Sequence, residues 1–246
     1  MDDSKKILET ITRDKKSREK EVDKSGEARE ITVYLADDHR LFREGLRTLL
    51  ENQPTIKVIG EAEDGRTAVE EILRLKPMVG IIDVSMPLLN GLEAVRRIKK
   101  HLPSCAILVL SMYKNEEYVY QAFKWGAQGY ILKDFAASDL FQAIENVSRG
   151  DFFISSSISR LLIEDIVLRP NREDTSHLYE SLTAREREIF QLIAEGQRNQ
   201  EIARQLDISI KTVEAHRANI MTKLRLKNVA ELVRYAVQIG IISPHF

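Results

Sequence analysis

The feature that most constrains the fold of this chain is a series of short apolar runs in its first 135 residues. They recur roughly every 25 residues with helix-like sequence between them, which is the rhythm of repeated βα units. The runs are Ile31–Ala36, Ile56–Ile59, Val79–Ile82, Ala106–Leu110 and Gly129–Leu132. They predict an α/β fold with a five-stranded, doubly wound parallel sheet of flavodoxin-like type.

Polar residues suited to chemistry stand where four of these runs end: Asp37 and Asp38, Asp83, Ser111, and Lys133. Ligands of open parallel sheets bind beyond the carboxyl ends of the strands, so these side chains should converge there. Three carboxylates placed together repel one another unless a cation or proton intervenes, and oxygen ligands without His or Cys suit Mg²⁺. An Asp carboxylate can accept a phosphoryl group while Lys and Ser face its oxygens, which predicts a phosphoryl-accepting site.

Each of these residues taken alone is better explained as a helix N-cap or a solvated side chain. No capping rule predicts all of them, in this order, at successive strand ends. A Mg²⁺-dependent phosphohydrolase with an Asp nucleophile would gather the same side chains and is the main alternative. Haloacid-dehalogenase-like enzymes carry Asp-x-Asp after the first strand, whereas this chain has adjacent Asp37 and Asp38 there and a solitary Asp83 after the third.

Three motifs across about residues 31–150 resemble the receiver domain of bacterial response regulators. They are Ala36-Asp37-Asp38-His39, Asp83-Val84-Ser85-Met86-Pro87 with Gly91 four residues later, and Gly129-Tyr130-Ile131-Leu132-Lys133. The resemblance implies that Asp83 is the phosphoacceptor, with Mg²⁺ held by Asp83, Asp37, Asp38 and the backbone carbonyl of Ser85. A receiver catalyses only its own phosphoryl transfer and dephosphorylation, so no other enzymatic activity is expected.

The same resemblance gives catalytic positions to Lys133 and Ser111 and switch positions to Ser111 and Tyr130. Phosphorylation is expected to pull Ser111 inward and let Tyr130 follow, which makes the domain a two-state element biased by phosphate. Trp125 departs from the family pattern, which usually has a small residue before Gly126. It is either an anchor for a partner or a partly buried core residue.

Composition limits the remaining classes of function. The chain has 246 residues, 37 basic against 38 acidic, and neither an apolar stretch of transmembrane length nor a signal-peptide core, so a cytoplasmic location is expected. The lone Cys105 excludes an internal disulfide, and the five scattered His residues give structural zinc no support.

The chain divides into four predicted segments. Residues 1–29 are dense in alternating charge and are expected to form a disordered extension. Residues 30–150 would form the receiver, and residues 151–180 a short helix and a flexible linker. Residues 181–246 turn wholly helical and would form a small second domain.

The second domain opens with a capping box from Thr183 to Glu186, on a helix that stops at Gly196. Asn199 is expected to cap a short second helix through Leu206, and a tight turn then leads into a third. This spacing predicts a helix-turn-helix pair.

The third helix has two contrasting faces. At about 100° per residue, Val213, Ile220 and Leu224 form one stripe that must face the core. The DNA-facing candidates are Lys211, Thr212, Glu214, Ala215, Arg217, Ala218, Asn219 and Thr222. Small side chains let a helix enter a major groove, where polar neighbours read base edges or hold phosphates. Residues 181–246 carry ten Lys and Arg against seven Asp and Glu, a net of +3, which modestly favours double-stranded DNA as a partner.

Nearly all of residues 181–242 resemble the LuxR-type helix-turn-helix domain. The resemblance lies in Leu182-Thr183-Ala184-Arg185-Glu186-Arg187-Glu188, Asn199-Gln200-Glu201-Ile202-Ala203, Ile208-Ser209-Ile210-Lys211-Thr212-Val213-Glu214-Ala215-His216 and Ile220-Met221-Thr222-Lys223-Leu224. A receiver followed by such a domain is the layout of the NarL/FixJ response regulators. The layout implies a sensor histidine kinase as phosphodonor, promoter DNA as target and a homodimer on activation.

Two further implications concern surfaces. The last helix, Asn228–Gly240, would pair two subunits through Val229, Leu232, Val233 and Ala236, although packing within the domain explains that stripe about as well. In this subfamily the unphosphorylated receiver is thought to cover the recognition helix. A regulator that works without phosphate, using its receiver only for dimerisation, is the second alternative.

Overall fold

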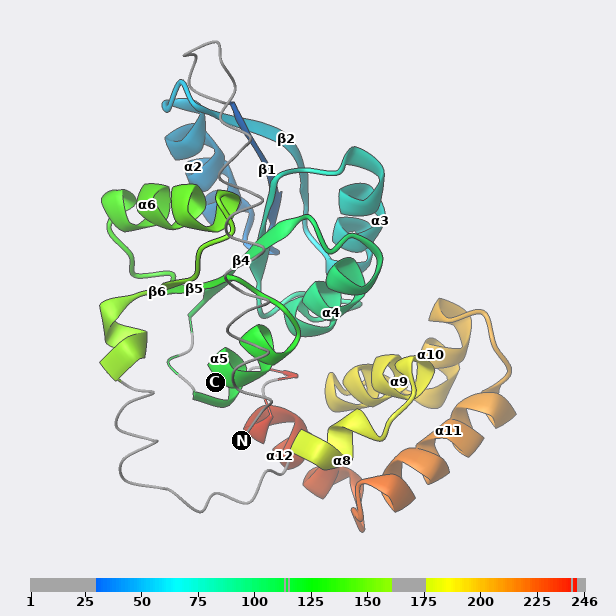
Figure 1. The fold of residues 1–246 in the computed structure, drawn as a ribbon. Coiled ribbons are helices and arrows are strands. Elements are labelled where there is room, and N and C mark those ends of the chain that lie inside the picture. The colour runs from blue at the N-terminus through cyan, green and yellow to red at the C-terminus, as the bar shows by residue number, and fades with distance from the viewer. Residues whose placement is uncertain (1–29, 113, 115, 161–175, 240, 243–246) are drawn as a thin grey trace, which may run out of the picture.

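The computed structural model describes residues 30–112, 114, 116–160, 176–239 and 241–242. Within that part of the chain, a sheet-containing body and a small helical body lie against one another (Figure 1). The charged extension expected at residues 1–29, and residues 161–175 of the expected helix and linker, lie outside the described residues.

The sheet has six strands, all of them parallel to their neighbours, in the order β2-β1-β3-β4-β5-β6. The strands are β1 (Ile31–Ala36), β2 (Ile56–Ala62), β3 (Val79–Asp83), β4 (Ala106–Ser111), β5 (Gly129–Leu132) and β6 (Phe153–Ile154). The α/β prediction is confirmed, but the count of five strands was one short. β6 has only two residues, so no periodicity in the sequence could reveal it.

Five helices cover the two faces of the sheet: α2 (Arg40–Glu51), α3 (Gly65–Leu75), α4 (Gly91–His101), α5 (Glu116–Lys124) and α6 (Ala137–Ser148). α2 and α6 pack on one face, where Leu50 and Ile144 join a buried cluster. α3, α4 and α5 pack on the other, where Ile72, Leu92 and Val119 join a second cluster. Strands buried on both faces explain why the sequence shows continuous apolar runs rather than alternation.

The helical body contains α8 (Ser176–Glu180), α9 (Ala184–Ala194), α10 (Asn199–Gln205), α11 (Ile210–Lys223) and α12 (Val229–Gln238) around one apolar cluster. The capping box is confirmed, since Thr183 accepts from the Glu186 amide and Glu186 accepts from the Thr183 amide. The cap predicted at Asn199 was wrong by one residue. Arg198 is the N-cap of α10, and the Asn199 side chain accepts a hydrogen bond from Arg217 instead.

Among the described residues, no helix combines the length and the apolar character that crossing a membrane requires.

Candidate functional site

The polar residues predicted at strand ends meet at the carboxyl edge of the sheet. Lys133, just after β5, places its Nζ atom 2.7 Å from Oδ2 of Asp37 and 2.8 Å from Oδ2 of Asp83. All three side chains are at most 3 % exposed. Ser111 ends β4 beside them, and its backbone carbonyl accepts a hydrogen bond from the Lys133 amide. The structure thus gathers residues up to 96 positions apart at one buried point.

Burial sets the electrostatics of this point. It raises the pKa of Asp83 from its ordinary 3.8 to about 6, because neighbouring Asp37 adds repulsion and the attraction of Lys133 only partly offsets both effects. Burial pulls the other way on Lys133, but its two carboxylate partners outweigh it and hold the pKa of the ammonium above its usual value. The site therefore favours an added cation or a proton.

The carboxylates of Asp37, Asp38 and Asp83 and the imidazole of His39 offer ligand atoms that all lie within 4.8 Å of one another. Three oxygen donors on two neighbouring strands fit a hard divalent cation. His39 was not among the predicted site residues, yet its Nδ1 lies 2.8 Å from Oδ1 of Asp38. Its position directly after the acidic pair was the available signal.

Phe42, on the first turn of α2, is a second neighbour that sequence reasoning missed. Its ring centroid lies 4.8 Å from Nζ of Lys133, and its ring packs edge-on against Phe135. A cation held beneath an aromatic face is stabilised without another negative charge.

The loop from Val84 to Asn90, between β3 and α4, follows directly after Asp83. It turns back sharply, since the Gly91 amide donates to the Val84 carbonyl and Leu88 adopts a left-handed φ of 66°. A Cβ atom at Gly91 would lie 1.8 Å from the carbonyl oxygen of Asp83, so only glycine fits there. This loop, called here the β3–α4 loop, carries the predicted metal ligand Ser85.

The two predicted switch residues both lie inside the domain. Ser111 and Tyr130 are fully buried and hydrogen-bonded to each other through their side chains. Burial raises the pKa of the Tyr130 hydroxyl well above its usual value. An inward displacement of Tyr130 was expected on phosphorylation, but this structure already places the ring inside.

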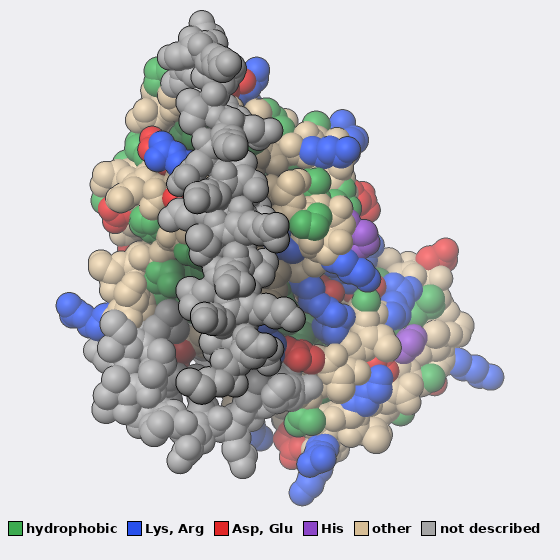
Figure 2. Space-filling view, in the orientation of Figure 1, with side chains coloured by type: hydrophobic (Ala, Val, Ile, Leu, Met, Phe, Trp, Pro, Cys, Tyr) green, Lys and Arg blue, Asp and Glu red, His purple; other side chains and the backbone are tan. Residues whose placement is uncertain are grey.

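Helix α11 has the two faces predicted for it. Val213, Ile220 and Leu224 are buried in the helical core. Seven of the eight DNA-facing candidates are exposed: Lys211, Thr212, Glu214, Ala215, Ala218, Asn219 and Thr222. The eighth, Arg217, is half-buried beside Asn199. Lys and Arg side chains are also spread over the visible face of the helical body (Figure 2).

The four candidates for subunit pairing on α12 divide into two pairs. Leu232 and Ala236 are fully buried in the core of their own domain. Val229 and Val233 are exposed and half-buried respectively, so they retain surface for a partner.

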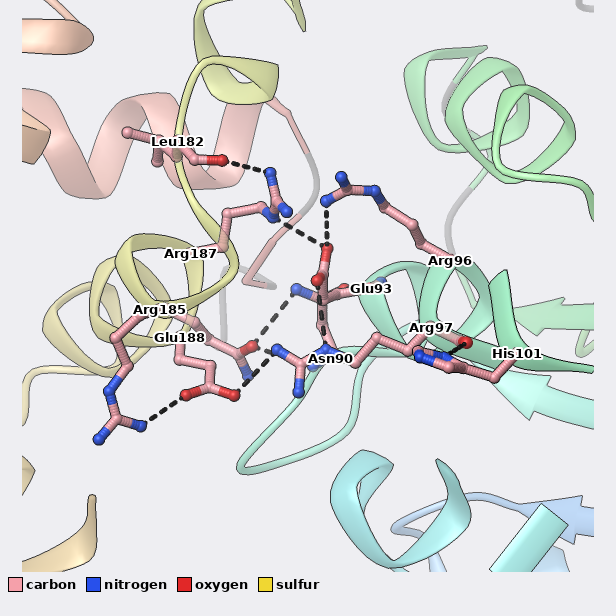
Figure 3. A network of polar contacts seen from close by, with 10 residues as sticks. Asn90, Glu93, Arg96, Arg97, His101, Leu182, Arg185, Arg187 and Glu188 are labelled. Carbon is pink, nitrogen blue, oxygen red and sulfur yellow. Dashed lines mark hydrogen bonds and ion pairs between the residues drawn. The ribbon is translucent and has the colours of Figure 1, made fainter. Parts of the chain in front are cut away.

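The receiver does not cover α11, contrary to the expectation from the subfamily. It contacts α9 instead, through a network of charged and amide side chains from α4 (Figure 3). Glu93 Oε2 lies 3.1 Å from Nε of Arg187, and Arg97 donates to Glu188 at 2.9 Å. Although burial opposes it, hydrogen bonds from Arg185 and Arg97 hold the pKa of Glu188 below its usual value. No sequence motif pointed to these charged and amide side chains as an interface.

Comparison with known proteins matches both bodies to families. The model of the response regulator receiver domain matches residues 33–145, and that of bacterial regulatory proteins of the luxR family matches residues 180–236. The oxygen regulatory protein NreC of Staphylococcus aureus is 39% identical over 211 residues, which cover 85% of this chain and 97% of NreC. NreC of Staphylococcus haemolyticus matches to the same extent.

Solved structures of RcsB from Salmonella are similar over 84% and 85% of this chain. One, of the Salmonella typhimurium response regulator, has a TM-score of 0.54 and 32% identity, covering 84% of this chain and 98% of RcsB. Another shows RcsB of Salmonella enterica serovar Typhimurium bound to a promoter with the phosphomimetic BeF3⁻, at a TM-score of 0.55 and 33% identity over 85% of this chain and 99% of RcsB. The chain therefore belongs to the NarL/FixJ family of two-component response regulators, in which phosphorylation of a receiver controls DNA binding and transcription through a LuxR-type domain.

Proposed function

We propose that Asp83 accepts the phosphoryl group, from a sensor histidine kinase, and that this event controls binding of α11 to promoter DNA. The observation that carries the proposal is the buried meeting of Asp83, Asp37 and Lys133 at three strand ends. An Oδ atom of Asp83 attacks phosphorus, the bond from phosphorus to the donor nitrogen breaks, and an acyl phosphate forms. Lys133 leaves its carboxylate partner and faces a phosphoryl oxygen, while the Ser111 hydroxyl donates to another.

The carboxylates of Asp37, Asp38 and Asp83 and the backbone carbonyl of Ser85 are the proposed ligands of Mg²⁺. When bound, this ion neutralises charge on the phosphoryl oxygens. The cluster of oxygen donors within 4.8 Å and the raised pKa of Asp83 support that assignment, because both favour an added cation.

The exposed face of α11 is proposed to enter the major groove. Alanines 215 and 218 allow a close approach, while Glu214 and Asn219 reach base edges and Lys211 reaches a phosphate. The solved complexes of RcsB with DNA, one of them with a promoter, support this partner. We place the receiver at residues 30–150 and the DNA-binding domain at residues 181–246, with homodimerisation on activation.

The test compares wild type with Asp83→Ala, each with Mg²⁺ and acetyl phosphate. DNA affinity is measured on promoter fragments and mass by light scattering. Phosphodonor should tighten binding and promote dimers only in the wild type. Equal binding by both proteins under all conditions would leave the DNA-binding domain intact as a reader and remove the control by phosphate.

A further inference from the structure

The β3–α4 loop is held by a side chain from the other domain. Oε1 of Gln191, on α9, accepts hydrogen bonds from the backbone amide of Asn90 at 2.9 Å and from its side-chain amide at 3.3 Å. Nε2 of Gln191 donates to the Met86 carbonyl at 3.4 Å. Gln191 and Asn90 are 2% and 1% exposed, so water cannot readily replace these bonds.

Both ends of the β3–α4 loop adjoin the phosphorylation site. Met86 follows Ser85, whose carbonyl is a proposed ligand, and the Gly91 amide is bonded to the Val84 carbonyl just after Asp83. The start of α4 packs tightly on the end of β3, since a Cβ atom at Gly91 would lie 1.8 Å from the Asp83 carbonyl oxygen, so α4 cannot move toward β3 without displacing it. A displacement of the loop therefore changes the position of Ser85 relative to Asp83 and breaks the bonds to Gln191.

Other contacts fasten α9 and its neighbours to the same side of the receiver. Glu93 pairs with Arg187, Arg97 with Glu188, and Lys124 with Glu180. Trp125 packs against the apolar clusters of both domains, with its ring centroid 6.4 Å from that of Tyr179. The helical body is thus attached at several points, so a movement of the β3–α4 loop away from α9 breaks contacts with the DNA-binding domain.

We propose that Gln191 is a positioning residue that holds the β3–α4 loop, so that docking of the DNA-binding domain and acceptance of a phosphoryl group at Asp83 oppose each other. The inference rests on the proposed function and names its regulation. Docking here accompanies a site in which Lys133 occupies oxygens of Asp83 and Asp37. Coupling between two equilibria is reciprocal. If phosphorylation favours undocking by a given free energy, undocking favours phosphorylation by the same free energy.

This coupling differs from occlusion of the DNA-reading surface. The outer face of α11 is exposed with both domains docked, so release of α9 does not serve to uncover it. Nor does the coupling need a movement of Tyr130, which is already inside. What undocking frees is the surface of α9 and the orientation of the whole DNA-binding domain.

The test uses the full chain and two readouts. The first is the initial rate at which acetyl phosphate and Mg²⁺ label the protein, resolved by phosphate-affinity electrophoresis. The second is the emission of Trp125, the only tryptophan in the sequence, which reports whether the DNA-binding domain still covers it. The variants are Gln191→Ala and, from the receiver side, Arg97→Ala, with Gln200→Ala on the exposed part of α10 as the matched control.

Gln191→Ala should be labelled about five-fold faster or more, which is the lower end of usual coupling strengths. Its Trp125 emission should be red-shifted before any phosphodonor is added, and Arg97→Ala should change both readouts in the same direction. Gln200→Ala should match the wild type. Circular dichroism confirms that each variant is folded, and Arg97→Ala carries the test alone should Gln191→Ala fail to fold.

Labelling of the folded Gln191→Ala and Arg97→Ala variants at the wild-type rate overturns the inference, even where the emission shifts. Absence of label in every protein, wild type included, is a different result: it refutes the proposed function and the inference with it. The two failures are therefore distinguished by the wild type alone.

Discussion

The proposed phosphorylation site and the proposed DNA-facing helix differ in how their side chains are placed. At the site, Asp37 and Asp83 are buried and each is already paired with Lys133. On α11, the outer face is exposed and its polar groups are ready for a partner. This difference suits a regulator. The site around Asp83 must resist activation in the absence of a signal, whereas the exposed face of α11 can stay preformed. Regulation then depends on the contacts between the receiver and α9, which connect the two regions.

The largest expected effect tests whether the buried site is the input. Asp83→Asn removes the nucleophile while keeping shape, so labelling by acetyl phosphate should fall at least about 100-fold, as expected when the nucleophile is lost. Asp134→Asn, an exposed carboxylate next to Lys133, is the control and should be labelled normally. Label retained on Asp83→Asn would place the acceptor elsewhere.

The ion pair between Glu93 of the receiver and Arg187 of α9 can be removed by a substitution in either domain. Glu93→Ala leaves Arg187 buried without its carboxylate, whereas Arg187→Ala leaves Glu93 with Arg96 and Arg97. Glu93→Ala should therefore weaken docking by about 3 kcal/mol or more, and Arg187→Ala by less. The double variant should lose less than the sum of the two. Trp125 emission along a urea titration measures each, and strictly additive losses would show that the pair does not interact.

The burial of the Asp83 carboxylate predicts that the free energy of unfolding depends on pH. The pKa of Asp83 is about 6 in the folded protein against an ordinary value of 3.8, so the contribution of its protonation to stability is fully present below about pH 4 and is lost as the pH rises through 6. The loss amounts to roughly 3 kcal/mol. In EDTA, Asp83→Asn should have a higher free energy of unfolding than wild type at pH 7, and this gain should shrink at pH 5. An equal gain at both values would show that the folded pKa is not raised.

The smallest effect concerns the preformed output. Lys211→Ala should weaken DNA binding by about 1 kcal/mol for all sequences and reduce the salt slope of affinity by about one. Lys57→Ala, an exposed lysine on β2, should change neither quantity. An unchanged salt slope in Lys211→Ala would remove this residue from the phosphate contacts.

The sequence predicted best what one segment encodes by itself. Asp83 and Ser111 lie at the ends of their strands, each as the first polar residue after a buried apolar run, and the Thr183 capping box requires only four consecutive residues. β6 was not predicted because a strand of two residues has no sequence periodicity. The N-cap of α10 was predicted one residue too late, since the Asn199 side chain bonds to Arg217 instead of capping the helix.

The interface between domains could not be predicted for a physical reason. Gln191 and Asn90 are 101 residues apart, and each is a polar residue that sequence patterns assign to solvent. Their burial depends on how two finished domains dock. Trp125 gave the one hint, since it breaks the receiver pattern and proves to contact both apolar clusters.

The exposure of α11 affects how the protein distributes between DNA-bound and free states. Its basic domain can associate with any stretch of chromosome through phosphates alone, and such binding needs no signal. We therefore expect the unphosphorylated protein to bind chromosomal DNA weakly and without sequence preference. Phosphorylation would then change how two DNA-bound copies of the protein pair on a specific site. The search for that site would begin before the signal arrives.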